Sequence, residues 1–133
     1  MSNKLNPITH NETSEVKIGD IFYVSYGKWE RYVKFFKVTN ILNEKEVKII
    51  EIGQNIADEP KQHSWEVNSQ EVSPNPGEVI GNEFLAQVSS DNPSSELSSP
   101  YLLFEWIPGQ SEKAEKVREG ETFTIMSFVP LHI

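Results

Sequence analysis

The chain has 133 residues and no cysteine, and its 12 basic and 20 acidic residues give a formal net charge of −8. This length suits one domain that buries its own hydrophobic core without stabilising disulfides or metal ions. The lack of thiols excludes a disulfide framework, a thiolate zinc site and a cysteine nucleophile. The acidity opposes binding to a phosphate backbone, which depends on Lys and Arg, and is compatible with a solubilising surface or with a surface for a basic partner.

Residues 1–15 are polar and aperiodic, so we expect a flexible N-terminal arm followed by a single β domain over residues 16–133. The arm has no charged segment leading into an apolar run, which predicts that it is not a signal peptide. No stretch approaches the roughly 20 apolar residues that a membrane span needs. Together with the absence of cysteine, this favours a cytoplasmic protein with no membrane association.

The first predicted strand covers residues 21–26, which are β-branched or aromatic and are bounded by glycines. The second covers residues 32–42. Its apolar residues change face near Phe35 and Phe36, which predicts either a β-bulge or burial of both faces. A turn at 43–46 then leads into a strand at 47–52, and we expect these two strands to form a hairpin.

The middle of the chain is polar and rich in turn residues. Residues 54–70 predict a long loop or a short helical turn followed by a weak strand, anchored by Trp65 and Val67. A short strand then enters a turn at 74–77, because Pro presets φ and Gly tolerates positive φ.

Two further short segments precede a low-complexity stretch. Residues 79–81 predict a tight corner, and residues 84–88 predict either a strand or one helical turn. Residues 89–100 are rich in Ser and Pro, so they cannot bury apolar area and are expected to form a mobile loop.

The last part of the chain contains two apolar segments. Residues 101–107 predict a strand that stops at Pro108, and residues 110–121 predict a charged loop. Residues 122–129 alternate apolar and polar side chains, slip at Met126 and predict a final strand.

This pattern predicts an all-β fold, a small partly open β-barrel or sandwich of about six to eight mostly antiparallel strands. No clean helical stripe, internal repeat or second domain is visible in the sequence. The predicted core consists of Ile21, Tyr23, Phe35, Val38, Ile41, Val47, Ile49, Ile52, Phe84, Val88, Leu103, Trp106, Phe123 and Ile125.

Residues 18–27 read I-G-D-I-F-Y-V-S-Y-G, and residues 33–38 read V-K-F-F-K-V. This opening, G-D-I-F-x-x-S-[WY]-G, resembles that of a family of small uncharacterised β-rich proteins of phages, plasmids and other mobile elements. Weaker matches at 47–53, 74–84 and 101–106 extend the resemblance over residues 16–109. The family turn is typically S-W-G-Y followed by acidic, Gln, Thr and Asn positions, and this chain departs from it after Ser25. The resemblance implies a mobile-element origin and a β-rich fold, and it implies no established activity.

The sequence carries no catalytic or metal-binding signature. His10, His63 and His132 do not stand at metal-ligand spacing. The serines do not occur in a nucleophile elbow, and no P-loop is present. We therefore expect a protein that is not an enzyme and has no cofactor. A carboxylate pair such as Glu51 and Glu105 ranks last, because no spacing supports it.

One candidate binding site is the turn over residues 26–32, hereafter the aromatic turn. Its candidate residues are Tyr26, Lys28, Trp29, Arg31 and Tyr32. Tyr, Trp and Arg dominate binding hot spots, hairpin tips often carry function, and aromatic and basic residues together can stack bases or hold phosphates. The alternative is that Trp29 and Tyr32 cap a barrel mouth while the nearby lysines are solvated along an edge strand.

A second candidate is an acidic stretch in which only Lys61 is basic. It consists of Asp58, Glu59, Glu66, Glu71, Glu78 and Glu83. Such a stretch imitates a phosphate track, covers a basic groove on a partner, or faces water. We take Glu66, Glu71 and Glu78 as its candidate binding residues.

These features favour a non-enzymatic protein-binding module of a phage or other mobile element, acting by occlusion as an inhibitor of a host defence system, in the manner of an anti-CRISPR protein. The alternative is a small-molecule or nucleotide binder with a mouth lined by Tyr26, Trp29 and Tyr32. Direct nucleic-acid binding is not expected. A monomer and a homodimer joined through an edge strand both stay open.

Overall fold

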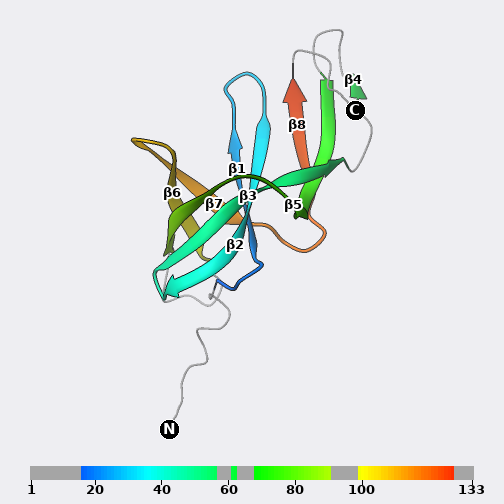
Figure 1. The fold of residues 1–133 in the computed structure, drawn as a ribbon. Helices are drawn as coiled ribbons and strands as arrows, with labels where there is room; N and C mark the ends of the chain where they lie inside the picture. Colours follow the sequence, from blue (N-terminus) through cyan, green and yellow to red (C-terminus); the bar gives the residue numbers. More distant parts are fainter. Residues whose placement is uncertain (1–15, 57–60, 63–67, 91–98, 128–133) are drawn as a thin grey trace.

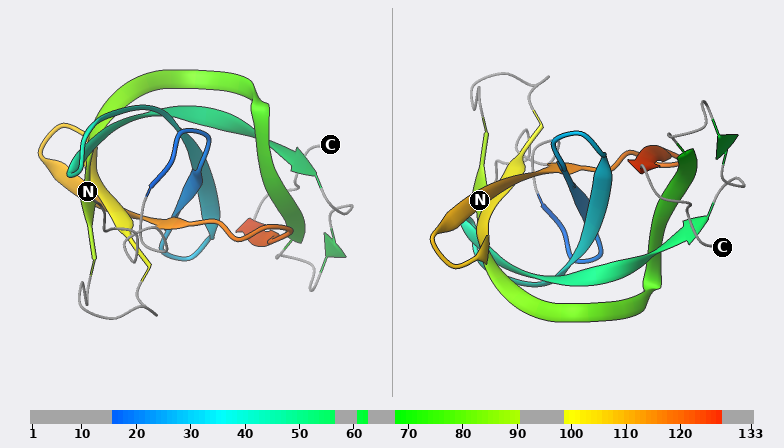
Figure 2. Two further views of the ribbon diagram at one scale, coloured as in Figure 1. Left: turned by 90° about the horizontal axis from the view of Figure 1, so that it is seen from below. Right: turned by 90° about the horizontal axis from the view of Figure 1, so that it is seen from above.

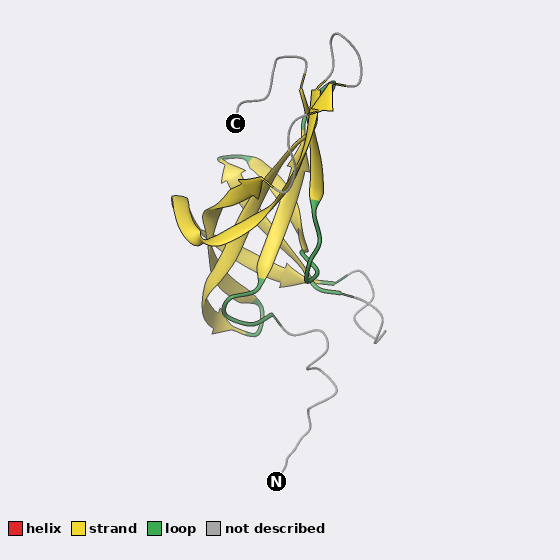
Figure 3. Cartoon of the chain, turned by 90° about the vertical axis from the view of Figure 1, so that its right-hand side faces the viewer, coloured by secondary structure: helices red, strands yellow, loops and turns green. Residues whose placement is uncertain are grey.

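The computed structural model describes residues 16–56, 61–62, 68–90 and 99–127. These residues form strands and connecting loops, without a helix (Figure 3). The prediction of an all-β, antiparallel fold is confirmed. The predicted arm at 1–15, the anchors Trp65 and Val67, and most of the Ser/Pro-rich stretch lie outside the described residues.

The described residues form eight strands that belong to one sheet. They are β1 (Ile21–Tyr26), β2 (Tyr32–Asn43), β3 (Glu46–Ile56), β4 (Lys61–Gln62), β5 (Asn68–Ser89), β6 (Tyr101–Ile107), β7 (Gln110–Lys116) and β8 (Phe123–Ser127) (Figure 1). The predicted first strand and the predicted β2–β3 hairpin are confirmed by the β1–β2 and β2–β3 pairings. In both cases β-branched and aromatic runs bounded by turn residues form the strands.

Six of the strands close a ring of hydrogen bonds in the order β3, β2, β1, β7, β6 and β5, with β5 returning to β3. The join between β1 and β7 is short, because only Phe22 and Tyr23 have ladder partners there. β4 and β8 both pair with the first part of β5, outside the ring.

β5 is a single strand of 22 residues, where the sequence predicted several short elements. The turn predicted at 74–77 and the corner predicted at 79–81 are wrong, and residues 84–88 are strand rather than a helical turn. The proline and glycine residues do not reverse the chain, since it stays paired with β3 on both sides of them.

The register between β3 and β5 shows how β5 continues through the proline and glycine residues at 74–77. Ile52 pairs with Val79, whereas the next residue, Gly53, pairs with Asn75. The intervening residues form a bulge, in which the Gly77 N–H donates to the Asn75 side chain at 3.3 Å. The strand bends here, so its two arms pair with different neighbours (Figure 2).

β1 and β2 lie within the angle formed by the two arms of β5 (Figure 2). They carry apolar side chains on both faces. Phe35 and Phe36 are adjacent in sequence, and both are 0% exposed. The first core contains Phe22, Val24, Phe36, Val38, Val47, Ile49, Ala86, Leu102, Phe104 and Ala114. The second contains Val33, Phe35, Ile52 and Val72. Burial of both faces is therefore the correct alternative at Phe35 and Phe36, and the bulges of β2 lie further along it.

The predicted core is right in part. Phe35, Val38, Val47, Ile49 and Ile52 are buried, and Ile21, Tyr23, Phe84, Val88, Leu103, Trp106, Phe123 and Ile125 are half-buried. Ile41 is 40% exposed, so its prediction is wrong, and it lies beside a register shift near the end of the hairpin. The buried faces of β1 and β6 were missed, because apolar residues occupy both faces and alternation does not distinguish them.

The charged loop predicted at 110–121 is wrong over its first part, which forms β7 and pairs with β6. Ala114 is the buried residue of this strand, and the long charged side chains stand mainly toward solvent. A single small buried residue between charged neighbours gives little hydrophobic periodicity in the sequence. The strand nevertheless pairs with β6 on one side and β1 on the other, which closes the ring. The predicted final strand is confirmed over β8 (Phe123–Ser127), and residues 128–129 of the prediction lie outside the described residues.

Candidate functional site

The aromatic turn is the tip of the β1–β2 hairpin (Figure 1). Tyr26 and Tyr32 form the last ladder pair of the hairpin. Gly27 follows with a φ of +115°, and a Cβ at this position would overlap the carbonyl oxygen of Glu30. The turn therefore requires glycine at position 27.

β8 holds this tip in place through backbone and side-chain contacts. The Arg31 N–H donates to the Met126 carbonyl at 2.9 Å, and the Met126 N–H donates back to the Arg31 carbonyl at 2.8 Å. The Ser127 hydroxyl donates to the Glu30 carboxylate at 3.0 Å and lies 3.4 Å from the Tyr32 hydroxyl. The tip is thus braced by a strand that lies far from it in sequence.

The aromatic side chains of the turn separate into a packed base and an exposed apex. The ring of Tyr26 lies 5.5 Å from that of Tyr32 and 5.2 Å, edge to face, from that of Trp106. Trp29 is 78% exposed, and the Lys28 ammonium lies 5.7 Å from the centroid of its ring. The apex therefore presents a large apolar surface to solvent next to a positive charge.

This arrangement changes the alternative explanation of the turn. Trp29 is exposed at the apex rather than packed as a cap. Lys34 and Lys37 lie on β2, which pairs with β1 on one side and β3 on the other, so they are not on an edge strand. The Lys37 ammonium donates to the Pro76 carbonyl at 2.9 Å.

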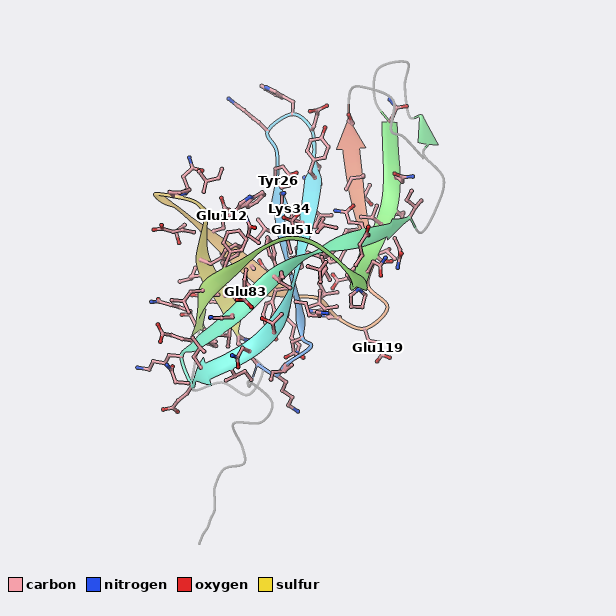
Figure 4. All side chains as sticks on the ribbon, viewed as in Figure 1. Tyr26, Lys34, Glu51, Glu83, Glu112 and Glu119 are labelled. Carbon is pink, nitrogen blue, oxygen red and sulfur yellow. The ribbon has the colours of Figure 1, made fainter. Side chains whose placement is uncertain are left out.

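An ion pair that sequence reasoning missed lies near the packed base of the turn (Figure 4). The Lys34 ammonium donates to the Glu51 carboxylate at 3.2 Å, and their side chains are 26% and 17% exposed. The ammonium also lies 4.6 Å from the centroid of Trp106. The available signal was that Lys34 alternates in phase with the buried Phe36 and Val38, which places a lysine on a core face of β2.

Lys34→Met is expected to lower the free energy of unfolding by about 1–2 kcal/mol, because it leaves the largely buried Glu51 carboxylate without its partner. Glu51→Gln should cost a similar amount. The double variant should be more stable than the sum of the two losses predicts, and a double-mutant cycle in urea measures this coupling. Strictly additive losses would show that the two charges do not interact.

The acidic stretch is described only in part, because Asp58, Glu59 and Glu66 lie outside the described residues. The Glu71 carboxylate accepts hydrogen bonds from the hydroxyls of Thr122, at 3.1 Å, and Thr124. These bonds connect β5 to β8 and to Thr122, the residue that precedes β8. They satisfy part of the hydrogen-bonding capacity of the carboxylate within the fold.

The other two described glutamates of this stretch also have neighbours within the chain. The Glu83 carboxylate accepts from the Thr39 hydroxyl at 2.9 Å and lies 3.8 Å from the Lys48 ammonium. The Glu78 side chain lies against the backbone of Gly53. A role for Glu71 or Glu78 in binding a partner stays a prediction.

Two cavities lie at opposite ends of β1. One, of about 310 Å³, is lined by residues 25–31 and Met126, beside the aromatic turn. The other, of about 560 Å³, is lined by Gly19, Asp20, Ile21, Ser73, Pro74, Pro76, Lys116, Val117, Arg118, Glu119, Gly120, Glu121 and Thr122. Tyr26, Lys28, Trp29 and Arg31 line the smaller of these two cavities, and Tyr32 lines neither.

Burial raises the pKa of Tyr23, and the nearby charges of Glu115 and Glu121 raise it further, while Arg118 opposes them. Because the folded state resists ionisation of this tyrosine, its contribution to stability is complete below about pH 10, the unfolded pKa, and is lost as the pH rises toward the folded pKa.

Tyr23→Phe is therefore expected to weaken the loss of stability above about pH 10, with little change at neutral pH. Thermal unfolding of both proteins across this pH range measures the difference. Parallel curves would contradict the raised pKa.

Glu51 and Glu105, the carboxylates considered for catalysis, each have a separate partner. Glu51 pairs with Lys34, and Glu105 accepts from the Gly109 N–H at 3.3 Å. The three histidines lie outside the described residues, within which no group of acidic or histidine side chains is placed to hold a metal ion.

The described part of the chain has no helix long and apolar enough to cross a membrane. Sequence reasoning proposed the aromatic turn from its residue types, and the structure adds the contacts that hold it, from Trp106, Met126 and Ser127. These contacts join segments that are distant in sequence, so no local sequence pattern predicts them. In comparisons with family models, curated proteins and solved structures, nothing matches this chain.

Proposed function

We propose that the protein is a non-enzymatic protein-binding module that uses the aromatic turn as its anchor. The observation that carries this proposal is the 78% exposure of Trp29 on a tip held by β8. Burying a tryptophan at an interface removes a large apolar area from water, at roughly 25 cal/mol per Å². A tip that is already fixed loses little conformational entropy on binding.

Within this proposal, the protein comes from a phage or another mobile element and acts in the cytoplasm as an inhibitor of a host defence protein, as an anti-CRISPR protein does. The resemblance of residues 18–27 and 33–38 to the mobile-element family supports this part of the proposal. Inhibition by occlusion needs no catalytic group. It needs a rigid surface that buries about 800 Å² on each partner.

The second candidate is a small-molecule or nucleotide binder at the packed base of the turn. The approach of Tyr26 to both Tyr32 and Trp106 favours it. The Lys34 ammonium, however, already lies over Trp106, so a planar ligand must compete with it for this ring. A thermal-shift panel of nucleotides tests this candidate, because a ligand of the native state raises the unfolding temperature.

Capture from lysate of the natural host tests the leading proposal, with three immobilised proteins compared. These are the wild type, Trp29→Ala, and Ile18→Ala as a control. Ile18 is 64% exposed and lies just before the other end of β1, so it matches Trp29 in exposure but not in place.

We expect at least one host protein to be retained by the wild type and by Ile18→Ala and to be lost by Trp29→Ala. Removal of a central tryptophan from an interface typically costs about 2 kcal/mol or more of binding free energy, which is roughly thirtyfold in affinity. Such a loss is enough for the partner to be washed from the resin. Equal retention by all three proteins, or no retained protein, would refute a binding role for the aromatic turn.

A further inference from the structure

We propose that the partner of the aromatic turn presents an acidic surface around an apolar recess, with the recess taking Trp29 and the acidic groups meeting Lys28 and Arg31. This inference rests on the proposed function and names the chemistry of its partner. It also identifies the two cations of the tip as binding residues alongside the tryptophan.

The charges of the tip support this assignment. Lys28 and Arg31 are exposed, and within the described part of the chain neither side chain is in an ion pair or donates a hydrogen bond. The one acidic residue between them, Glu30, accepts a hydrogen bond from Ser127. With Glu30 included, residues 26–32 carry a net charge of +1 in a chain of net charge −8, and the two cations stand on either side of Trp29, the most exposed aromatic side chain among the described residues.

Three cations elsewhere in the described structure are paired with a carboxylate of the same chain. Lys34, Lys48 and Lys116 each lie within 4 Å of a carboxylate of the same chain, at 3.2, 3.8 and 3.5 Å. Because those charges are already compensated, they gain less from an acidic partner than the tip does. Lys17 and Lys45 are exposed at other places, and no aromatic contact is found beside them, so they serve as controls.

The geometry places charge and apolar surface together. The Lys28 ammonium lies 5.7 Å from the centroid of Trp29, so a carboxylate that meets this ammonium brings its neighbouring groups to the indole. Arg31 starts from a backbone fixed by Met126, which limits the directions that its guanidinium can take. An acidic group beside an apolar one on the partner satisfies both contacts at once.

An acidic protein fits this tip better than a nucleic acid does. Proteins that bind DNA through its backbone make about 6–10 phosphate contacts, whereas the tip offers two cations. A nucleic acid also extends beyond the tip with one charge per roughly 1.7 Å, and would run along a chain of net charge −8. A compact acidic patch faces the tip alone, and charges beyond it are screened over about 8 Å at physiological salt.

Selection from a display library of random short peptides tests the inference without a known partner. The wild type is the bait, and the selected peptides are then measured by fluorescence anisotropy against three variants. These are Trp29→Ala, the double variant Lys28→Glu/Arg31→Glu, and the control double variant Lys17→Glu/Lys45→Glu. Both double variants have the same total charge, so a difference between them reports the place of the charge.

We expect the selected peptides to be enriched in Asp and Glu next to an aromatic or aliphatic residue. Lys28→Glu/Arg31→Glu should weaken their binding at least about tenfold, and the control should leave it within about twofold. Raising the salt from about 0.1 M to about 1 M, which shortens the screening length from about 10 Å to about 3 Å, should weaken wild-type binding as well.

The inference is overturned if the selected peptides are neutral or basic, if none is selected, or if the two double variants behave alike. Loss of binding in Trp29→Ala without an effect of charge reversal overturns the acidic partner but leaves the proposed function standing. Binding that survives Trp29→Ala overturns both. Tight binding of a labelled oligothymidylate that only Lys28→Glu/Arg31→Glu abolishes would identify a nucleic-acid site and refute the acidic protein.

Discussion

Replacing Phe36 with alanine is expected to lower the free energy of unfolding by about 3–5 kcal/mol, as for other fully buried phenylalanines. The side chain is 0% exposed, and its ring lies 4.9 Å from that of Phe104, 6.1 Å from that of Phe84 and 6.3 Å from that of Trp106. Because a domain is stable by only about 5–15 kcal/mol, this loss brings the chain close to unfolding. Urea denaturation followed by circular dichroism measures it.

Phe35→Ala provides the comparison, because Phe35 is equally buried on the opposite face of the same strand. Since β2 contributes to both cores, we expect each variant to shift one common transition. Leu85→Ala, at a position 54% exposed, should change stability by less than about 0.5 kcal/mol. Two separate transitions, or a loss below about 1 kcal/mol for Phe36→Ala, would contradict the shared strand or the packing of its core.

Replacing Gly27 with alanine is expected to cost about 2–3 kcal/mol, the upper part of the range for a backbone held in a rarely populated conformation. Its φ is +115°, and the new Cβ would overlap the Glu30 carbonyl oxygen. The tip must therefore rearrange, which moves Trp29 relative to β8. We expect a lower unfolding temperature together with weaker capture of any partner that depends on Trp29.

Gly109→Ala is the matched control, because Gly109 also has a positive φ, +86°, in the β6–β7 turn, but a Cβ there meets no atom within 4 Å. It should cost about 1–2 kcal/mol from the backbone conformation alone and leave capture unchanged. Equal losses for the two variants would show that the contact with Glu30 does not matter.

Strands with dense local signals were predictable. The segment that became β1 lies between glycines, and the β2–β3 hairpin has two apolar runs joined by a short polar turn. Such signals act over a few residues, so they need no knowledge of the partner strand. The all-β class followed from them.

β5 and β7 were mispredicted, because their structure depends on distant strands. The proline and glycine residues at 74–77 favour a turn by themselves, but pairing with β3 on both sides keeps the chain extended around a bulge. The segment at 110–116 looks like a loop because Ala114 is its buried residue, and pairing with β6 makes it a strand. Local propensity was overridden by tertiary contacts in both cases.

The sequence by itself determined the all-β class, the first strand, the β2–β3 hairpin and the residue types gathered in the aromatic turn, because each depends on neighbouring residues. Only the tertiary structure decided which face of each strand is buried and which aromatics of the turn are packed. It also brought Glu51 and Trp106 to Lys34, and Met126 to Arg31. The physical reason is that side chains alternate along a strand while both faces of β1 and β2 are apolar, so burial is settled by the strands that arrive from elsewhere in the chain.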